Sequence, residues 1–285
     1  MAALTNDDEL LVPRAREGDM EALDALVRRH QSWVFNLALR MVWRRETAED
    51  ATQEILIKAV TKLSQFAGTS AFRTWLYRIA VNHLLNVRKS EMEANAMDFT
   101  AMGTSLDGVP DEDLPDERSL PVTTQVLVEE ARLGCITAML MCLDRRQRLA
   151  FILGEVFGET SEAGAAAMDV SPDNFRQLLS RARRDLYAFM NDKCGLVNQA
   201  NPCRCARKAA GFMRHGWLDP HHLQFSPDRL ATVLAEAPAR LEELQSLDHQ
   251  HAELYRQQPF LAGPDLAQQL REILLRSGFD TPPGG

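Results

Sequence analysis

Residues 72–82 read FRTWLYRIAVN and set the pattern for the whole chain. Apolar side chains recur here every three or four residues, the spacing that places them on one face of an α-helix. The pattern predicts a helix from about Ala71 to Lys89. The side chains on its apolar face are Phe72, Trp75, Leu76, Ile79, Ala80 and Leu84.

The segments around this helix have the same period. Leu23–Met41 predicts one helix and Ala51–Leu63 another, which begins near Thr47–Asp50 with acidic side chains that favour a helix N-terminus. Gln65–Ser70 breaks the pattern. Farther along, helices are predicted at 122–143, 145–157, 160–168 and 172–190. Strand alternation and internal repeats are not evident in the sequence, so the predicted fold class is all-α.

The composition is that of a soluble globular protein. The chain has 285 residues, 45% hydrophobic and 25% charged, with a formal net charge of −8, which is long enough for two or three compact units. No run of about 18 apolar residues suggests a membrane span, and residues 1–9 are polar and acidic where a secretory signal would be basic and then apolar. The odd number of cysteines, 5, does not suggest a disulfide framework. We expect a cytoplasmic protein with no membrane partner.

The acidic excess lies in one segment. Residues 91–129 carry 1 basic and 10 acidic side chains, whereas the rest of the chain is close to neutral. The part from Asp98 to Pro121 also contains several glycines and prolines, and it cannot bury enough apolar surface to fold by itself. We predict a flexible acidic linker that separates an N-terminal unit from a C-terminal unit.

Residues 160–190 have the layout of a helix-turn-helix. A short alanine-rich helix, whose small side chains allow close packing, precedes a turn in which Ser171 can cap the next helix and Pro172 can take its first position. The second helix would lie in the major groove of DNA, and the alternative is a solvated arginine face. Its predicted base-facing residues are Asp173, Asn174, Arg176 and Gln177, and its predicted phosphate contacts are Arg181, Arg183 and Arg184.

Basic and aromatic residues interleave on the predicted helix at 71–89. After a loop of small polar residues, such a helix makes a platform on which unpaired bases stack and phosphates are neutralised. Aromatic residues at helical spacing are, taken alone, more often core, and Trp75 and Ile79 are expected to be core in either case.

These blocks, in this order, resemble bacterial sigma factors. Residues 48–55 followed by 72–82 resemble conserved region 2, and residues 143–148 through 181–186 look like region 4. With only these two regions, the chain resembles the extracytoplasmic-function (ECF) group over about residues 16–190. The resemblance implies a dissociable, non-enzymatic subunit that binds core RNA polymerase and directs it to promoters. The implied divisions are a region 2-like unit at 16–92, the linker at 93–121, a region 4-like unit at 122–190 and a C-terminal extension at 191–285.

The resemblance also implies roles for single residues. In the family, the helix matching Ala48–Leu63 docks on the clamp helices of the polymerase β′ subunit, and region 4 has the β flap as its polymerase partner. The implied clamp contacts are Asp50, Gln53 and Glu54, for which a solvated helix face is the alternative. The loop and helix at 65–82 bind the melted minus-ten element, and the helix-turn-helix reads the minus-thirty-five duplex. The implied minus-ten contacts are Phe66, Thr69, Ser70, Arg73, Arg78 and Asn82, with Arg88 and Lys89 on phosphates.

The C-terminal extension contains a cysteine cluster. Three thiolates from Cys194, Cys203 and Cys205, with one histidine, could complete a tetrahedral zinc site, although the spacing is not that of paired CxxC motifs. A thiol redox switch, with flanking cations lowering the thiol pKa, and inert cysteines are the alternatives. Otherwise we expect that no cofactor is required. The candidate histidines are His215, His221 and His222.

The end of the chain is predicted to be helical. Leu230–Leu247 and Pro264–Leu275 read as amphipathic helices joined by a turn at 257–259. His249 and His251 are two residues apart on a helix, so they cannot face one site together and are expected at the surface. Residues 259–264 are similar to a short motif in the tails of some ECF sigma factors, which implies a regulatory or polymerase-contacting extension. The resemblance also makes an anti-sigma factor a candidate partner.

Two other functional classes fit the sequence less well. A stand-alone helix-turn-helix regulator would explain residues 160–190, but it leaves the loop and basic helix at 65–82 without a role. A metal-dependent enzyme built on the tail would lack a neighbouring general base, a phosphate-binding glycine loop and a His-Glu-x-x-His motif. The leading hypothesis is therefore an initiation subunit of RNA polymerase.

Overall fold

The computed structural model describes residues 5–87, 98–225, 247–256, 260–261 and 263–276. Within these ranges the chain is helical and has no strand, which confirms the all-α prediction. The first helices are α1 (Thr5–Arg16), α2 (Met20–Val42), α3 (Arg45–Thr61) and α4 (Phe72–Asn86). The middle of the chain forms α6 (Phe99–Gly108), α7 (Thr124–Met141), α8 (Arg145–Phe151), α9 (Ser161–Met168) and α10 (Pro172–Lys193). The last helices are α11 (Cys205–Arg214), α13 (Leu247–Arg256) and α14 (Leu266–Arg276).

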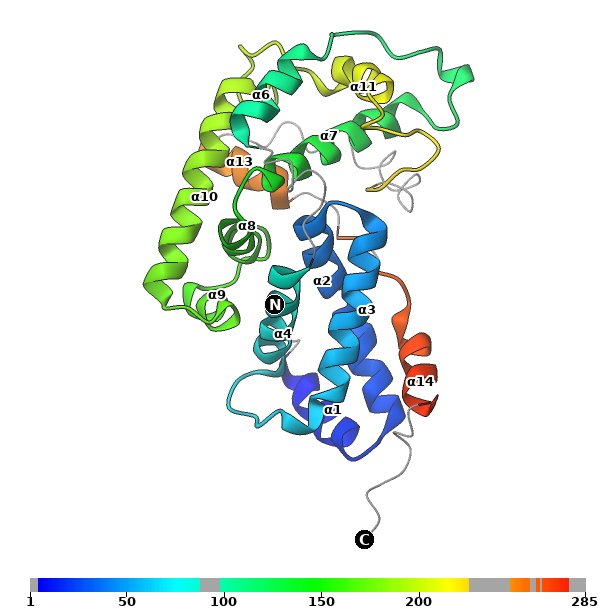
Figure 1. Cartoon of the computed structure of the whole chain (residues 1–285), viewed down its shortest axis with the longest axis vertical. Helices are drawn as coiled ribbons and strands as arrows, with labels where there is room; N and C mark the ends of the chain where they lie inside the picture. Colours follow the sequence, from blue (N-terminus) through cyan, green and yellow to red (C-terminus); the bar gives the residue numbers. More distant parts are fainter. Residues whose placement is uncertain (1–4, 88–97, 226–246, 257–259, 262, 277–285) are drawn as a thin grey trace.

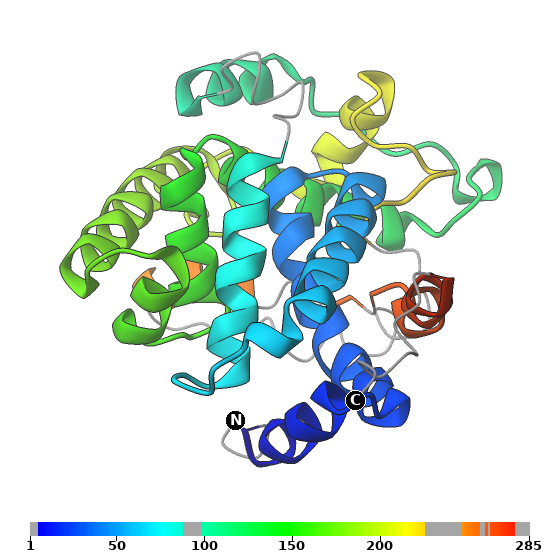
Figure 2. The same ribbon diagram turned by 60° about the horizontal axis from the view of Figure 1, so that its bottom comes forward.

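The helices form two groups that lie side by side. Figures 1 and 2 both show α1 to α4 as one bundle, with α8, α9 and α10 along one side of it and α14 along the other. One continuous apolar core runs through both groups, from α2 to α10. None of the described helices combines the length and the apolar character needed to cross a membrane.

Helix α2 is the central element of the first bundle. Asp19 caps it by accepting hydrogen bonds from the backbone N–H groups of Glu21 and Ala22, at 3.0 and 3.1 Å. Most of its side chains beyond Leu23 are buried, because α1, α3, α4 and α14 all pack against it. The predicted helix at 23–41 is thus confirmed as an element covered on nearly every side.

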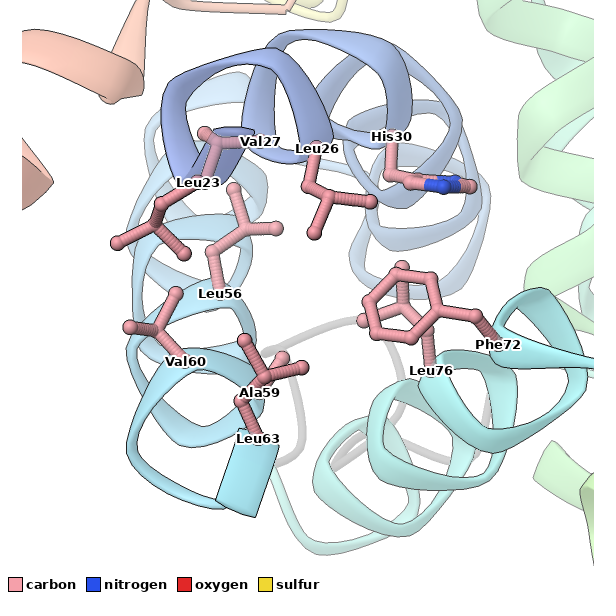
Figure 3. A pocket seen from close by; sticks show the side chains of 10 residues that line it. All are labelled: Leu23, Leu26, Val27, His30, Leu56, Ala59, Val60, Leu63, Phe72 and Leu76. Atoms are coloured by element: carbon pink, nitrogen blue, oxygen red, sulfur yellow. The ribbon is translucent and has the colours of Figure 1, made fainter. Parts of the chain in front are cut away.

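A small cavity lies between α2, α3 and α4 (Figure 3). Its volume is about 20 Å³, and apart from His30 its walls are apolar. A pocket for a small-molecule ligand is typically about 300–1,000 Å³, so this space is a packing defect of the bundle. The imidazole of His30 points away from solvent and lies 3.1 Å from the Asp8 carboxylate of α1.

Two arginines in the first turn of α8 cap the C-termini of three other helices. Arg148 donates to the carbonyl oxygens of Leu140, Met141 and Leu143 at the end of α7, and to Met41 O at the end of α2. Arg145 donates to the carbonyl oxygens of Leu84, Leu85 and Val87 at the end of α4. The last four carbonyls of a helix have no partner within the helix, and a cation there also matches the helix dipole. These two side chains therefore join the two groups of helices.

The helix-turn-helix forms as the sequence predicts. The Thr160 hydroxyl accepts from Ala163 N at the start of α9, and the Ser171 hydroxyl accepts from Asn174 N at the start of α10, with Pro172 in the first turn. Gly164 allows the close approach of the two helices, because a Cβ there would lie 2.4 Å from the ring of Phe175.

The acidic segment differs from the predicted flexible linker. Residues Phe99–Gly108 form α6, in which Met102 and Leu106 are buried, and the ring of Phe99 lies 5.3 Å from that of Phe189 on α10. Val109 is 1% exposed and packs with Phe212 of α11. The segment cannot fold by itself, but it acquires apolar partners from helices distant in sequence.

The remaining helix predictions have mixed outcomes. The helix predicted at 145–157 is divided into α8 and a π-helical turn, Ile152–Val156. Helix α14 confirms the prediction at 264–275, and α13 contains the helical segment expected around His249 and His251, whereas α1 and α11 were not anticipated. The helix predicted at 230–247 lies almost wholly outside the described residues. The surface position expected for His251 is wrong, because its side chain is 1% exposed and stacks on Tyr187, with ring centroids 4.4 Å apart.

Candidate nucleic-acid and polymerase interfaces

The seven side chains predicted to face DNA from α10 all lie on its solvent face. The opposite face of the helix is anchored in the core by Phe175, Leu179 and Leu186, so the polar face points outward. Contact with base edges and phosphates requires polar side chains exposed on one face in this way, although Arg176 pairs with Asp173 and Arg184 with Asp185 on the same surface. The exposed residues are Asp173, Asn174, Arg176, Gln177, Arg181, Arg183 and Arg184.

One of these arginines is held by a buried carboxylate. Glu155, on the π-helical turn, is 5% exposed and accepts from the guanidinium of Arg183. Tyr187 donates to the same carboxylate at 3.0 Å, and burial raises the pKa of the Tyr187 hydroxyl. The guanidinium of Arg256 on α13 lies 3.7 Å from the carboxylate as well. Sequence reasoning did not identify Glu155, because its role arises only when three helices meet.

The predicted minus-ten platform is partly exposed. Thr69 and Ser70 lie in an exposed loop, in which the preceding Gly68 adopts a left-handed backbone conformation with φ +72°. Asn82 lies on the exposed side of α4. Phe66 is a correction: its side chain is 8% exposed, and its ring packs against Phe72 and Trp75 at 5.7 and 5.4 Å. In this structure Phe66 supports the loop and does not present its ring to solvent. Arg88 and Lys89 lie outside the described residues.

The second group of helices contacts the arginines of this platform, of which Arg73 is partly buried and Arg78 is exposed. Arg73 pairs with Glu159, which also accepts from the Tyr77 hydroxyl at 3.2 Å. Arg78 donates to the carbonyl oxygen of Ala166 on α9 at 3.2 Å. These contacts bring the two predicted DNA-binding units together, with both arginines occupied by the opposite unit.

The candidate polymerase face of α3 is open. Asp50 and Glu54 are exposed and Gln53 is partly exposed, one helical turn apart on the side away from the core. Glu54 lies 3.6 Å from Lys58, the distance of a weak, solvated ion pair, and 3.9 Å from the His83 imidazole. Burial, followed by the charge of Lys58, lowers the pKa of the His83 imidazole. The face therefore carries two carboxylates that the fold does not need.

The tail cysteines are buried more than the sequence suggested. Cys194 and Cys203 are neighbours in an isolated β-bridge, and burial raises the pKa of both thiols. Burial also raises the pKa of Cys205 to about 12, so the effect of burial outweighs that of the nearby cations, which act to lower the thiol pKa. Burial therefore favours the thiol form of these cysteines over the reactive thiolate.

The structure does not assemble the predicted metal ligands. In the part of the chain that is described, no three His, Cys, Asp or Glu side chains lie close enough together to hold a metal ion. His215 is exposed, and its ring stacks on Trp217 at a centroid distance of 5.1 Å. His222 contacts Asp219 at 3.0 Å on the surface.

Comparison with known proteins identifies the two units. Residues 26–92 match the model of Sigma-70 region 2, and residues 133–186 match that of Sigma-70, region 4. RNA polymerase sigma-H factor of Pseudomonas aeruginosa is 46% identical over 79 residues, which span 28% of this chain and 41% of that protein.

Two longer matches extend over both units. ECF RNA polymerase sigma-E factor of Escherichia coli K12 is 33% identical over 180 residues, 62% of this chain and 90% of that protein. The sigma-E factor of Salmonella typhimurium LT2 matches with the same identity and coverage. Both family models also fall on the helices that carry the interfaces described above. The chain therefore belongs to the ECF sigma factors, the promoter-specific initiation subunits of RNA polymerase.

Proposed function

We propose that residues 16–92 bind core polymerase and the melted minus-ten strand, and that residues 122–190 read the minus-thirty-five duplex. The observation that carries this proposal is the face of α10, where seven polar side chains are exposed on a helix whose other face is fixed in the core. A helix held in this way can enter the major groove without unfolding, with its N-terminal residues on base edges.

In the first unit, we assign strand capture to the loop at 67–71 and the exposed side of α4. Thr69, Ser70 and Asn82 supply hydrogen-bonding groups, while Arg73 and Arg78 supply charge for phosphates. Arg88 and Lys89, which lie outside the described residues, are proposed as further phosphate contacts. Phe66 is assigned to loop support, because its ring is buried.

The proposed polymerase partners are the β′ clamp helices for α3 and the β flap for the second unit. The protein then acts by binding and positioning and performs no catalysis of its own. It works in the cytoplasm, where the polymerase is, and its activity needs no cofactor. The tail thiols have no role in this proposal, and an anti-sigma factor remains a candidate partner.

A stand-alone duplex-binding regulator is a weaker account of the same structure. It uses the exposed face of α10, but it gives no purpose to the exposed loop at 67–71 or to the open carboxylates of α3. The match to Sigma-70 region 2 covers both of these elements.

The polymerase face of α3 provides the test of this function. We expect the double change Asp50→Ala and Glu54→Ala to weaken binding to core polymerase by roughly tenfold, or about 1.4 kcal/mol, since interface residues that matter cost about 1 kcal/mol or more when truncated. The affinity is measured by fluorescence anisotropy of labelled protein titrated with core enzyme.

The matched control removes a carboxylate elsewhere. Asp192 at the end of α10 is 71% exposed, and Asp192→Ala should leave the affinity unchanged. Equal affinities of the α3 variant and the wild type would show that this face is only solvated. If neither the wild type nor the α3 variant binds core polymerase, the proposal that the protein is a polymerase subunit is wrong.

A further inference from the structure

The tail of the chain is fixed to the second unit through α13. His251 stacks on Tyr187, and the buried ring of Tyr255 makes an edge contact with Phe151, with centroids 4.9 Å apart. Arg256 donates to the backbone carbonyl of Glu155 at 2.8 Å. Helix α13 thus covers the π-helical turn beside the start of the helix-turn-helix.

A few residues later, the chain is fixed to the first unit through α2. The side chain of Asn36 donates to Leu261 O at 2.8 Å and accepts from Leu261 N at 3.0 Å, so one buried amide satisfies both backbone groups of a tail residue. Gln31, one turn earlier, accepts from Leu266 N at 3.1 Å. Helix α2 therefore presents two buried amides that serve a segment more than 200 residues away in sequence, beyond the second unit.

The apolar packing agrees with these hydrogen bonds. Leu261, Leu266, Ala267 and Leu270 are all under 5% exposed. Gly263 lies directly on α2: a Cβ built there would be 3.2 Å from the Cβ of Phe35 and 3.4 Å from the Cα of Ser32. Figures 1 and 2 show α14 on the side of α2 and α3 opposite the helix-turn-helix.

The two attachments are too close in sequence to permit separation of the units. Arg256 and Phe260 are four residues apart, so the chain between them reaches at most about 14 Å. Simultaneous contact with the minus-ten and minus-thirty-five elements needs sites separated by roughly 25 base pairs, about 85 Å of duplex at about 3.4 Å per pair. In the closed structure the two DNA-facing surfaces touch each other, because Arg73 and Arg78 contact Glu159 and Ala166 O. Binding of both elements therefore requires the units to move apart, and two attachments joined by this short chain oppose that movement.

The closed arrangement also occupies groups that DNA requires. Arg73 and Arg78 of the first unit bind Glu159 and Ala166 O of the second. Separation of the units would free Arg73 and Arg78 together.

We propose that the tail is a built-in inhibitor of this sigma factor. We define the strap as α13 together with residues 260–261 and 263–276; the strap binds both units and holds them closed, and its release from α2 activates promoter binding. The ligand of the α2 face is thus a segment of the same chain, recognised through backbone groups of Leu261 and Leu266. This inference rests on the function proposed above.

A reversible lock tests the proposal in the full-length protein. The Gly263 position lies against α2, where a Cβ would be 3.4 Å from the Cα of Ser32, and the pair Ser32→Cys and Gly263→Cys is chosen on this close approach for oxidation with oxidised glutathione. We expect the oxidised variant to lose at least about tenfold in run-off transcription with core polymerase, and dithiothreitol to restore it. Each single cysteine variant and the oxidised wild type serve as controls. Full activity of the locked protein would overturn the proposal.

The opposite variant releases the strap. Leu261→Asp with Leu270→Asp places carboxylates in the contact with α2, and we expect a larger radius of gyration in X-ray scattering and a several-fold rise in transcription. Gln268→Asp, on the exposed side of α14, is the matched control. Circular dichroism checks that the helices remain folded.

The two measurements distinguish the failure of each idea. A released variant that is no more active than the wild type, while the wild type itself initiates transcription, would overturn the strap and leave the sigma assignment intact. Inactivity of the wild type, the reduced lock and the released variant alike would refute the proposed function. A released variant as compact as the wild type would refute the strap even in that case.

Discussion

Replacement of Arg148 by alanine is expected to lower the free energy of unfolding by about 3–5 kcal/mol, the range for truncation of a large buried side chain whose partners lose their hydrogen bonds. The side chain is 1% exposed, and its guanidinium serves the ends of two helices at distances of 2.6–3.1 Å. Its loss leaves the carbonyls of Leu140, Met141 and Leu143 without this donor, and it leaves a cavity where the side chain packed. Urea unfolding followed by circular dichroism measures the change.

A neighbouring arginine provides the control for this effect. Arg146 stands on the same turn of α8 but is exposed, and Arg146→Ala should change the stability by less than about 0.5 kcal/mol. Arg148→Lys should recover only part of the loss, because an ammonium group cannot reproduce the spread of the guanidinium donors. Equal stabilities of Arg148→Ala and Arg146→Ala would contradict the capping role.

The second large effect concerns recognition of the minus-thirty-five element. We expect Arg176→Ala, tested in the polymerase holoenzyme, to weaken binding to the preferred promoter by about 10- to 100-fold, since a good bidentate base contact discriminates by about 1–3 kcal/mol. The loss should be concentrated at one base pair, whose substitution no longer matters in the variant. Competition binding with a set of single-base promoter variants measures both quantities.

Arg184 provides the comparison for base reading. It lies farther along α10, with a 71% exposed side chain paired to Asp185, and is assigned to a phosphate. Arg184→Ala should weaken binding to all sequences alike and lower the salt dependence by about one unit. Uniform losses for both variants would show that α10 contacts only the backbone of DNA.

Local sequence patterns were sufficient to predict the helices to which we assign DNA binding. The period at 72–82 is determined by residues within one segment, and so are the Ser171 cap and Pro172 at the start of α10. The exposure of the α10 polar side chains follows directly, because a buried apolar face fixes the direction of the other face.

Other features depend on partners that the sequence does not place. Arg145 and Arg148 bind backbone carbonyl groups of distant helices. Every residue has such a carbonyl, so the sequence does not show which ones the arginines will contact. Phe66 becomes core because Phe72 and Trp75 close over it. The same reason explains the packing of α6 within an acidic segment and the burial that raises the pKa of the tail thiols.

The attachment of the tail is the least predictable part of the molecule. Asn36 and Gln31 look like polar interruptions in an apolar helix, and only the fold shows that their amides bind Leu261 and Leu266. The need for glycine at position 263 likewise becomes clear only from the close approach of this residue to Phe35. Sequence analysis predicted a regulatory or polymerase-contacting extension. It did not predict whether the extension inhibits or activates, or which surface of the protein it contacts.

Run-off transcription from a pool of genomic promoter fragments, with purified core RNA polymerase, tests the assignment of the chain most directly. Initiation by the added protein at defined sites that core enzyme alone does not use is the predicted result, with higher yield from the Leu261→Asp and Leu270→Asp variant. Absence of new start sites with both the wild type and that variant would contradict the account.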